Sequence, residues 1–390
     1  MGKFSKIVMA FTIFVLTSAF TLTSIPVGAV AIDLGDASKY NAFIKNDFKV
    51  KGTDTQGRVA IGGNLTVEGG HDIGAEITNF AMGDGPSLVV GGNIVKNNNE
   101  WGSAGFINIY KDHPSILGDV MYAGDVIDNS SGGGFLGHLH QVSTNNLPVD
   151  FDNAFAHLNQ LSSELMATTA NGSTTSAGVN WQGNITGPLT FTPHTTPSDN
   201  VYVFEVTQAQ LNSTTEWSVE GVSDNAALIF NVINPNREKS KENWAGNKDT
   251  CSAGQIGCVH FSQTNISING QLLSERYRKD TFNAEHQQKI LFNFGHATQV
   301  NLASDIYGSV LAPHADLKAN PSVIWGQVIG KSWEGNMQIN YNPFPALGAN
   351  SPGPTPVPSP EVIWIFALAL TLLYVNNKPV LSRKNKSISN

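Results

Sequence analysis

Two histidines separated by one residue are the first feature of this sequence whose side chains could support chemistry. His138 and His140 flank Leu139, and on a β-strand both imidazoles would lie on the same face. Imidazole is a common zinc ligand, but a zinc site needs further ligands at suitable spacing. No third ligand is identifiable here, and a pair of surface histidines beside the glycines at 132–134 is the alternative. We therefore expect no metal and no other cofactor.

Carboxylates near predicted turns are the second chemical feature. Asp119, Asp125 and Asp316 each lie close to a strand-turn corner. Two that converged at a suitable separation could cleave a glycosidic bond, as in polysaccharide-cleaving β-helix enzymes. Aspartate at a corner also stabilises turns through its side chain, and the chain has no Gly-x-Ser-x-Gly nucleophile motif. We expect a protein that is not an enzyme, with a polysaccharide-acting enzyme as the alternative.

Nucleotides and nucleic acids are poor candidates for a ligand. Gly326 to Ser332 ends like a phosphate-binding loop, but three residues separate its glycines where that loop has four. The residues that follow favour a strand instead of a helix. The formal net charge of −8 also argues against nucleic acid, because phosphate binding needs concentrated Lys and Arg.

Two cysteines and four of the seven tryptophans complete the set of candidate residues. Cys251 and Cys258 are separated by glycine-containing sequence, and in an exported protein they are expected to form a disulfide. Tryptophans can stack on sugars or lie in a core. The candidates are Trp101, Trp181, Trp217 and Trp333.

A repeated strand-glycine-strand pattern indicates how these residues are positioned. The pattern occurs at 59–67, at 88–95 and, more loosely, at 120–127. Near the end of the domain, residues 306–312 are matched by 324–330 at an offset of 18. That offset is too long for a tight hairpin, and it fits one coil of a parallel β-solenoid. We expect a mainly β, parallel β-helix-like domain, with an Ig-type sandwich as the alternative.

One helix is expected beside the solenoid. Phe151, Phe155, Leu158, Leu161 and Leu165 recur at helical spacing, and Asp150 can cap the first turn. Further strands are predicted at 201–206, 227–232 and 290–294. The Ser/Thr/Gly/Asn-rich stretch 168–198 reads as loop interrupted by short strands, and 234–258 reads as an exposed insertion.

Both ends of the chain carry export and anchoring features. Residues 1–31 have a basic start, an apolar run and small residues near Ala29 and Ala31, which is typical of a cleaved signal peptide. The predicted domain covers 32–346, followed by a proline-rich linker at 347–361, an apolar segment at 362–375 and a basic tail at 376–390. We expect this tail to hold the protein in the membrane, or to serve as a sorting signal.

These pieces together resemble the choice-of-anchor A domain proteins of bacteria. The resemblance rests on Leu34 to Ala37, Gly57 to Asn64, the capped helix after Val149, and the paired segments beginning at Gly308 and Gly326. It implies an adhesive, β-helix-like module with no assigned catalytic residues. The tail resembles a PEP-CTERM sorting signal, but Ser359 stands where that motif has glutamate.

The sequence therefore predicts an exported cell-surface protein, anchored by its C-terminus or released. Its expected partner is an extracellular matrix polysaccharide or another surface ligand, and it contacts the membrane through the C-terminal segment. An ice-binding solenoid is a further alternative. Such a protein would present regular threonine arrays on one face, whereas the clusters at Thr168–Thr169 and Thr174–Thr175 match no repeat.

Overall fold

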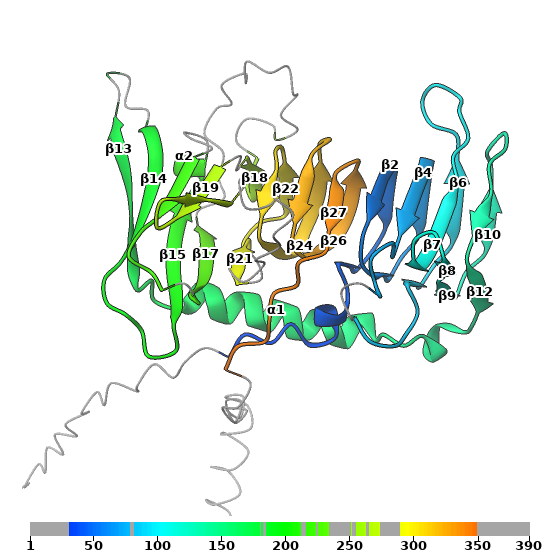
Figure 1. Ribbon diagram of the computed structural model, residues 1–390, viewed down its shortest axis with the longest axis horizontal. Coiled ribbons are helices and arrows are strands. Elements are labelled where there is room, and N and C mark those ends of the chain that lie inside the picture. Colours follow the sequence, from blue (N-terminus) through cyan, green and yellow to red (C-terminus); the bar gives the residue numbers. More distant parts are fainter. Residues whose placement is uncertain are drawn as a thin grey trace, which may run out of the picture.

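The chain folds into a stack of coils built from short strands (Figure 1). This computed structural model describes residues 31–78, 82–179, 181, 185–211, 216–223, 225–233, 251, 255–262, 265–273 and 289–348. Strands on the same side of successive coils pair in parallel, so the coils form a β-solenoid with three sides, here named faces A, B and C. The prediction of a mainly β, solenoid-like fold is confirmed.

Face A runs along the whole stack. In spatial order its strands are β15 (Val201–Thr207), β17 (Ala227–Ile233), β21 (Ile290–Asn293), the start of β24 (Ser309–Ala319), the start of β26 (Val328–Gly335), β1 (Ala42–Ile44), β3 (Val59–Ile61), β5 (Leu88–Val90), β9 (Asp119–Tyr122) and β12 (His138–Gln141).

Faces B and C complete each coil. Face B consists of β18 (Cys258–Phe261), β22 (Gln299–Leu302), the ends of β24 and β26, the starts of β2 (Phe48–Thr55) and β4 (Leu65–Ile73), β6 (Ile94–Asn97) and β10 (Val126–Asp128). Face C consists of β23 (Ile306–Tyr307), β25 (Val323–Trp325), β27 (Gln338–Asn340), the ends of β2 and β4, β7 (Ile107–Asp112) and β11 (Phe135–Leu136), while β8 (Ile116–Leu117) pairs antiparallel with β7.

The remaining elements lie at one end and along one side. A separate five-stranded sheet holds β13 (Gly172–Val179), β14 (Ile185–Pro193), β16 (Glu216–Val219), β19 (Asn265–Ile268) and β20 (Gln271–Leu272). The helices are α1 (Phe151–Ala167), α2 (Gln208–Leu211) and the 3-10 turns η1 (Gly35–Lys39) and η2 (Thr144–Asn146).

Sequence reasoning underestimated the β13–β14 hairpin. These two strands pair antiparallel over most of their length, where short strands within a loop were expected. The reason is burial, because Leu189 and Phe191 of β14 are fully buried and anchor a pair of strands that is rich in Ser, Thr and Gly.

The chain enters the solenoid in its middle. β1 pairs on one side with β3 and on the other with β26, which is far away in the sequence. From β1 the coils wind to β12 at one end of the stack. After α1 and the β13–β14 hairpin, the chain enters face A at β15 at the other end and winds back to β26. Figure 1 shows this seam as early, blue strands lying beside late, orange ones.

Helix α1 covers face A (Figure 1), and this explains why short strands there are buried on both sides. In β3, the side chains of Val59 and Ile61 point into the coil, while Ala60 belongs to the cluster under the helix. Phe155, Leu158, Leu161 and Leu165 form the helix side of that cluster. The predicted cap is present, since Asp150 Oδ1 accepts a hydrogen bond from the Asn153 N–H at 3.1 Å.

The strand-glycine-strand repeats form the corner between faces A and B. A Cβ on Gly91 would lie 2.2 Å from the carbonyl oxygen of Gly62, so successive coils approach too closely for a side chain at this position. Two residues after Gly62 and Gly91 lie Asn64 and Asn93, whose side-chain oxygens form a ladder of hydrogen-bond acceptors along the stack. Asp47 Oδ1 accepts the Asn64 N–H, and Asn64 Oδ1 accepts the Asn93 N–H, each at 2.8 Å.

The matched segments 306–312 and 324–330 stack directly on one another. Ile306 pairs with Ile324 and Val310 with Val328, so the offset of 18 is the register of two neighbouring coils. Residues 328–335 form strand β26, and the segment from Gly326 to Ser332 is therefore not a loop leading to a helix.

The predicted termini lie outside the described residues. This holds for the signal segment up to Ala29, for the linker beyond residue 348, and for the apolar segment and basic tail. Among the residues that the structure describes, no helix is both long and apolar enough to cross a membrane.

Candidate ligand-binding site

A surface hollow of about 560 Å³ lies on face C. Asp54 at the end of β2, Asp72 at the end of β4 and Asn108 on β7 contribute one lining side chain from each of three successive coils. Asp54 is in register with Asp72, and Asp72 is in register with Asn108. Neighbouring strands are about 4.8 Å apart, so these three positions form a row across the coils.

Glycines at the corner between faces B and C create the hollow. Gly52, Gly69, Gly70 and Gly105 all contribute to its lining. A Cβ on Gly105 would lie 1.1 Å from the carbonyl oxygen of Gly69, so no side chain fits there. The coils meet backbone to backbone at this point, and at Gly52 a Cβ would meet nothing within 4 Å.

Hydrogen bonds fix the polar row. The Asn108 side-chain amide donates to Asp72 Oδ1 at 2.7 Å, and the Gln338 side-chain amide donates to Asp54 Oδ2 at 3.2 Å. Burial raises the pKa of the Asp54 carboxyl, the negative charge of Asp72 raises it further, and the hydrogen bond from Gln338 acts in the opposite direction. The two carboxyl groups therefore differ in environment although they occupy equivalent positions on neighbouring coils.

A buried imidazole belongs to the same lining. His71 is 3% exposed, and its Nε2 lies 3.3 Å from Thr55 Oγ1. Burial lowers the pKa of His71 to about 4, although the nearby Thr53 backbone acts in the opposite direction. The ring is neutral at neutral pH. Asn108 Oδ1, in the same lining, is buried without a well-formed hydrogen bond.

An aromatic ring completes the hollow. Phe106 immediately precedes β7, lines the hollow and is 54% exposed. Sequence reasoning identified none of these residues. A signal was present, because Asp54 and Asp72 are separated by 18 residues, the same offset that relates the repeated segments at 306–312 and 324–330.

The carboxylates singled out from the sequence do not come together. Asp316 accepts hydrogen bonds from Ser332 Oγ at 2.7 Å and from the Lys331 ammonium group at 3.3 Å, within neighbouring coils. Asp125 follows Asn93 in the corner ladder, where its N–H donates to Asn93 Oδ1 at 2.8 Å. Asp119 lies on β9 of face A, whereas Asp316 lies in the part of β24 that belongs to face B.

The two predicted histidines share one carboxylate partner. His138 Nδ1 lies 3.4 Å and His140 Nε2 lies 3.2 Å from Asp119 Oδ1, on the neighbouring strand. The common face expected for the two imidazoles is therefore present. Within the described part of the chain, no group of three or more His, Cys, Asp or Glu side chains is arranged to hold a metal ion.

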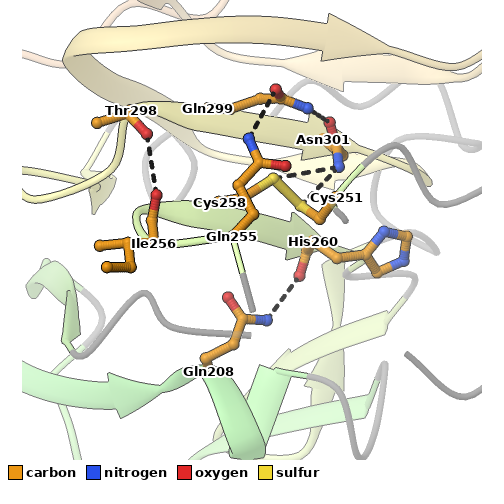
Figure 2. The surroundings of a disulfide bond; sticks show 9 residues. All are labelled: Gln208, Cys251, Gln255, Ile256, Cys258, His260, Thr298, Gln299 and Asn301. Atoms are coloured by element: carbon orange, nitrogen blue, oxygen red, sulfur yellow. Dashed lines mark hydrogen bonds between the residues drawn. A yellow bond between two sulfur atoms is a disulfide. The ribbon is translucent and has the colours of Figure 1, made fainter. Parts of the chain in front are cut away.

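Cys251 and Cys258 form the expected disulfide, which lies at the start of strand β18 of face B and is shown in Figure 2. The Asn301 side-chain amide, on the neighbouring strand, lies 3.0 Å from Cys251 Sγ and 3.8 Å from Cys258 Sγ. The Thr298 hydroxyl donates to the Ile256 carbonyl in the loop between the cysteines. The disulfide thus ties the end of the 234–258 insertion, most of which lies outside the described residues, to strand β18.

The four tryptophans considered as sugar-stacking candidates divide into two pairs. Trp217 and Trp333 are buried, and Trp333 stacks on Phe48 with ring centroids 5.8 Å apart. Trp101 and Trp181 are 81% and 90% exposed. None of the four belongs to the lining of the hollow.

The outer row of face B is charged. Lys318 forms an ion pair with Glu334, and Lys49 lies 3.8 Å from Glu334 and 2.9 Å from Glu68. The positions that pair along this row are His260, Asn301, Lys318, Glu334, Lys49, Thr66, Val95 and Ile127. One of these eight residues, Thr66, is a threonine. Thr174 and Thr175 lie on β13, outside the stacked faces.

Comparison with known proteins gives a family and distant structural likenesses. The family model described as "Putative Ice-binding-like adhesive domain" matches residues 33–341. An ice-binding protein from the Antarctic ascomycete Antarctomyces psychrotrophicus is 13% identical, with 81% of this chain and 98% of that chain covered and a TM-score of 0.32.

Two further solved structures are similar at the same level. An ice-binding protein from an Antarctic biological consortium is 12% identical, with coverage of 80% and 90% and a TM-score of 0.33. A glycosylated ice-binding protein from an Arctic yeast is 12% identical, with coverage of 84% and 99% and a TM-score of 0.29. Likenesses this low carry no argument about the ligand. No curated protein matches the chain significantly.

Proposed function

Because the chain belongs to the family of ice-binding-like adhesive domains, we propose that it is the adhesive module of an exported protein. In this proposal the module binds a polymer outside the cell and does not transform it. The observation that carries the proposal is the hollow on face C, where Asp54, Asp72 and Asn108 present one polar group per coil. A row of this kind suits a ligand that extends across several coils.

The export and anchoring steps are part of the same proposal. They rest on the signal-like residues 1–31 and on the tail at 362–390, with its resemblance to choice-of-anchor A proteins that carry a sorting signal. Expression of the chain cut after residue 346 should release the protein from cells into the medium. If the shortened protein stays attached to cells, the anchor has been assigned to the wrong segment.

A polysaccharide-acting enzyme is the second candidate, and one observation favours it. Asp54 and Asp72 lie in register on neighbouring strands, and a retaining glycosidase uses two carboxyl groups that are close together. The raised pKa of Asp54 is the property expected of a general acid. Both carboxyl groups already accept hydrogen bonds from amides within the protein, which favours a binding role.

Ice binding is supported only by the family's description. The outer row of face B carries ion pairs in place of a regular threonine array. Ion pairs keep a surface strongly hydrated, and this is unfavourable for docking onto ice. We therefore expect no thermal hysteresis and no inhibition of ice recrystallisation.

The decisive experiment is retention of the purified mature protein on an array of glycans and matrix proteins, with product analysis of every glycan. Retention without new products is the expected result. Release of shorter glycans would replace the adhesive assignment with the enzymatic one. Failure to retain any glycan or matrix protein would contradict both.

A further inference from the structure

Resting on the adhesive function proposed above, we propose that the hollow on face C is a subsite for a neutral glycan, one that carries hydroxyl groups and no acidic groups. The proposal follows from the balance of hydrogen-bond donors and acceptors in the lining, from its charge, and from the exposed ring of Phe106.

The described lining offers mainly acceptors. Asp54 and Asp72 each present a carboxyl group. One N–H of the Asn108 amide is directed to Asp72, and one N–H of the Gln338 amide is directed to Asp54. A matching ligand must therefore supply donors, and the hydroxyl groups of a sugar do so.

The charge of the hollow restricts which glycans fit. Two carboxyl groups lie on adjacent coils, and no Lys or Arg is among the residues that line the hollow. A uronic acid or a sulfated sugar would add a third negative charge without a cation to balance it. Acidic polymers are thus disfavoured, whereas a neutral sugar meets no repulsion.

The geometry of the site suggests how a sugar ring would lie. Phe106 offers an exposed aromatic surface in the same hollow, and the apolar face of a pyranose can pack against such a ring. Gly52, in the same lining, leaves open space where a Cβ would lie. Asp54, Asp72 and Asn108 run along the stack of coils, so the glycan chain would follow the solenoid axis.

The test compares neutral and acidic glycans on one array, using the mature protein and two variants. Phe106→Ala should weaken neutral-glycan binding by about tenfold or more, as expected for the loss of one aromatic contact together with the packing it supports. The double variant Asp54→Asn/Asp72→Asn keeps the shape of the hollow and removes its charge, so it should gain affinity for acidic glycans.

Matched controls come from exposed residues elsewhere. Ile256, 80% exposed in the loop between the cysteines, is replaced in Ile256→Ala, and Asp152, 93% exposed on α1, is replaced in Asp152→Asn. Both controls should bind as the parent protein does. Circular dichroism and thermal unfolding verify that all variants are folded.

The outcomes separate this inference from the broader proposal. If the parent protein binds glycans and both hollow variants bind identically to it, the hollow is not the site, although the adhesive function stands. If the parent protein prefers acidic glycans, the ligand class is wrong. If it retains no glycan, the subsite is ruled out, and any retained matrix protein would still support adhesion.

Discussion

Single side-chain oxygens hold neighbouring coils in register at the corner between faces A and B. Asp47, Asn64 and Asn93 each accept a backbone N–H from the following coil. The backbone at this corner turns away from the strand ladder, so these N–H groups depend on the side chains for a partner.

Replacing Asn64 by alanine should therefore destabilise the protein. The Asn93 N–H would lose its acceptor at 2.8 Å, at a cost of about 1–2 kcal/mol in the free energy of unfolding. Asn64→Asp keeps an oxygen acceptor and should cost clearly less. Urea unfolding of both variants measures the difference, and equal losses would show that the side-chain oxygen contributes little.

His71 makes stability depend on pH. Its pKa is about 4 in the folded protein, whereas an unfolded chain has the ordinary value of about 6.5. As pH falls below about 6.5, the unfolded state binds a proton that the folded state does not, and stability decreases until about pH 4. The slope contributed by this residue approaches about 1.4 kcal/mol per pH unit.

His71→Gln should remove this part of the pH dependence. The measurement is the free energy of unfolding at pH 7 and at pH 4.5 for both proteins, since other groups titrate equally in each. The variant should lose less stability on acidification than the parent protein. An identical loss in both would mean that His71 is protonated in the folded state.

At the scale of elements, two buried asparagines join α1 to face A. The Asn231 amide donates to the Leu165 carbonyl at 2.6 Å, close to the end of the helix. The Asn293 amide donates to the Ser162 carbonyl at 3.0 Å and to Asn231 Oδ1 at 2.9 Å. Apolar packing alone would allow the helix to slide along the stack, whereas these directional bonds fix its position.

Asn293→Ala should cost about 2–4 kcal/mol, because the residue is fully buried and its loss leaves several polar groups without partners. Gln160→Ala, at an exposed position on the same helix, serves as the control and should change stability by less than about 0.5 kcal/mol. Thermal and urea unfolding provide the comparison. If both variants lost the same stability, the apolar stripe of α1 and not the buried asparagines would fix the position of the helix.

At the scale of the whole molecule, the chain winds outward from the seam between β1 and β26. Strands at the seam have partners on both sides. In the terminal coil, β10, β11 and β12 each pair with one strand within the described residues. Val126 and Leu139 of this coil are each 41% exposed.

Amide hydrogen exchange should therefore be fastest in β10–β12 and slowest near the seam, because local opening is easiest where contacts are fewest. Exchange followed by mass spectrometry on peptides from β1, β3 and β12 would show the gradient. Equal protection of β12 and β1 would indicate that another molecule covers the terminal coil in solution.

Local and periodic features were readable from the sequence alone. The strand-glycine-strand repeats, the offset of 18 and the Asp150-capped helix all correspond to elements of the structure. Backbone preferences and the alternation of buried side chains depend on residues that are close in the chain, so a sequence carries them directly. The disulfide followed from the spacing of its two cysteines.

Which coils are neighbours was decided only in three dimensions. The pairing of Ala42 with Val328 follows from the return of the chain along α1, and no local pattern specifies it. The same applies to the gathering of Asp54, Asp72 and Asn108 and to the contact of Asp119 with His138 and His140. Each depends on which strands stack together, and burial of the core over the whole stack sets that order.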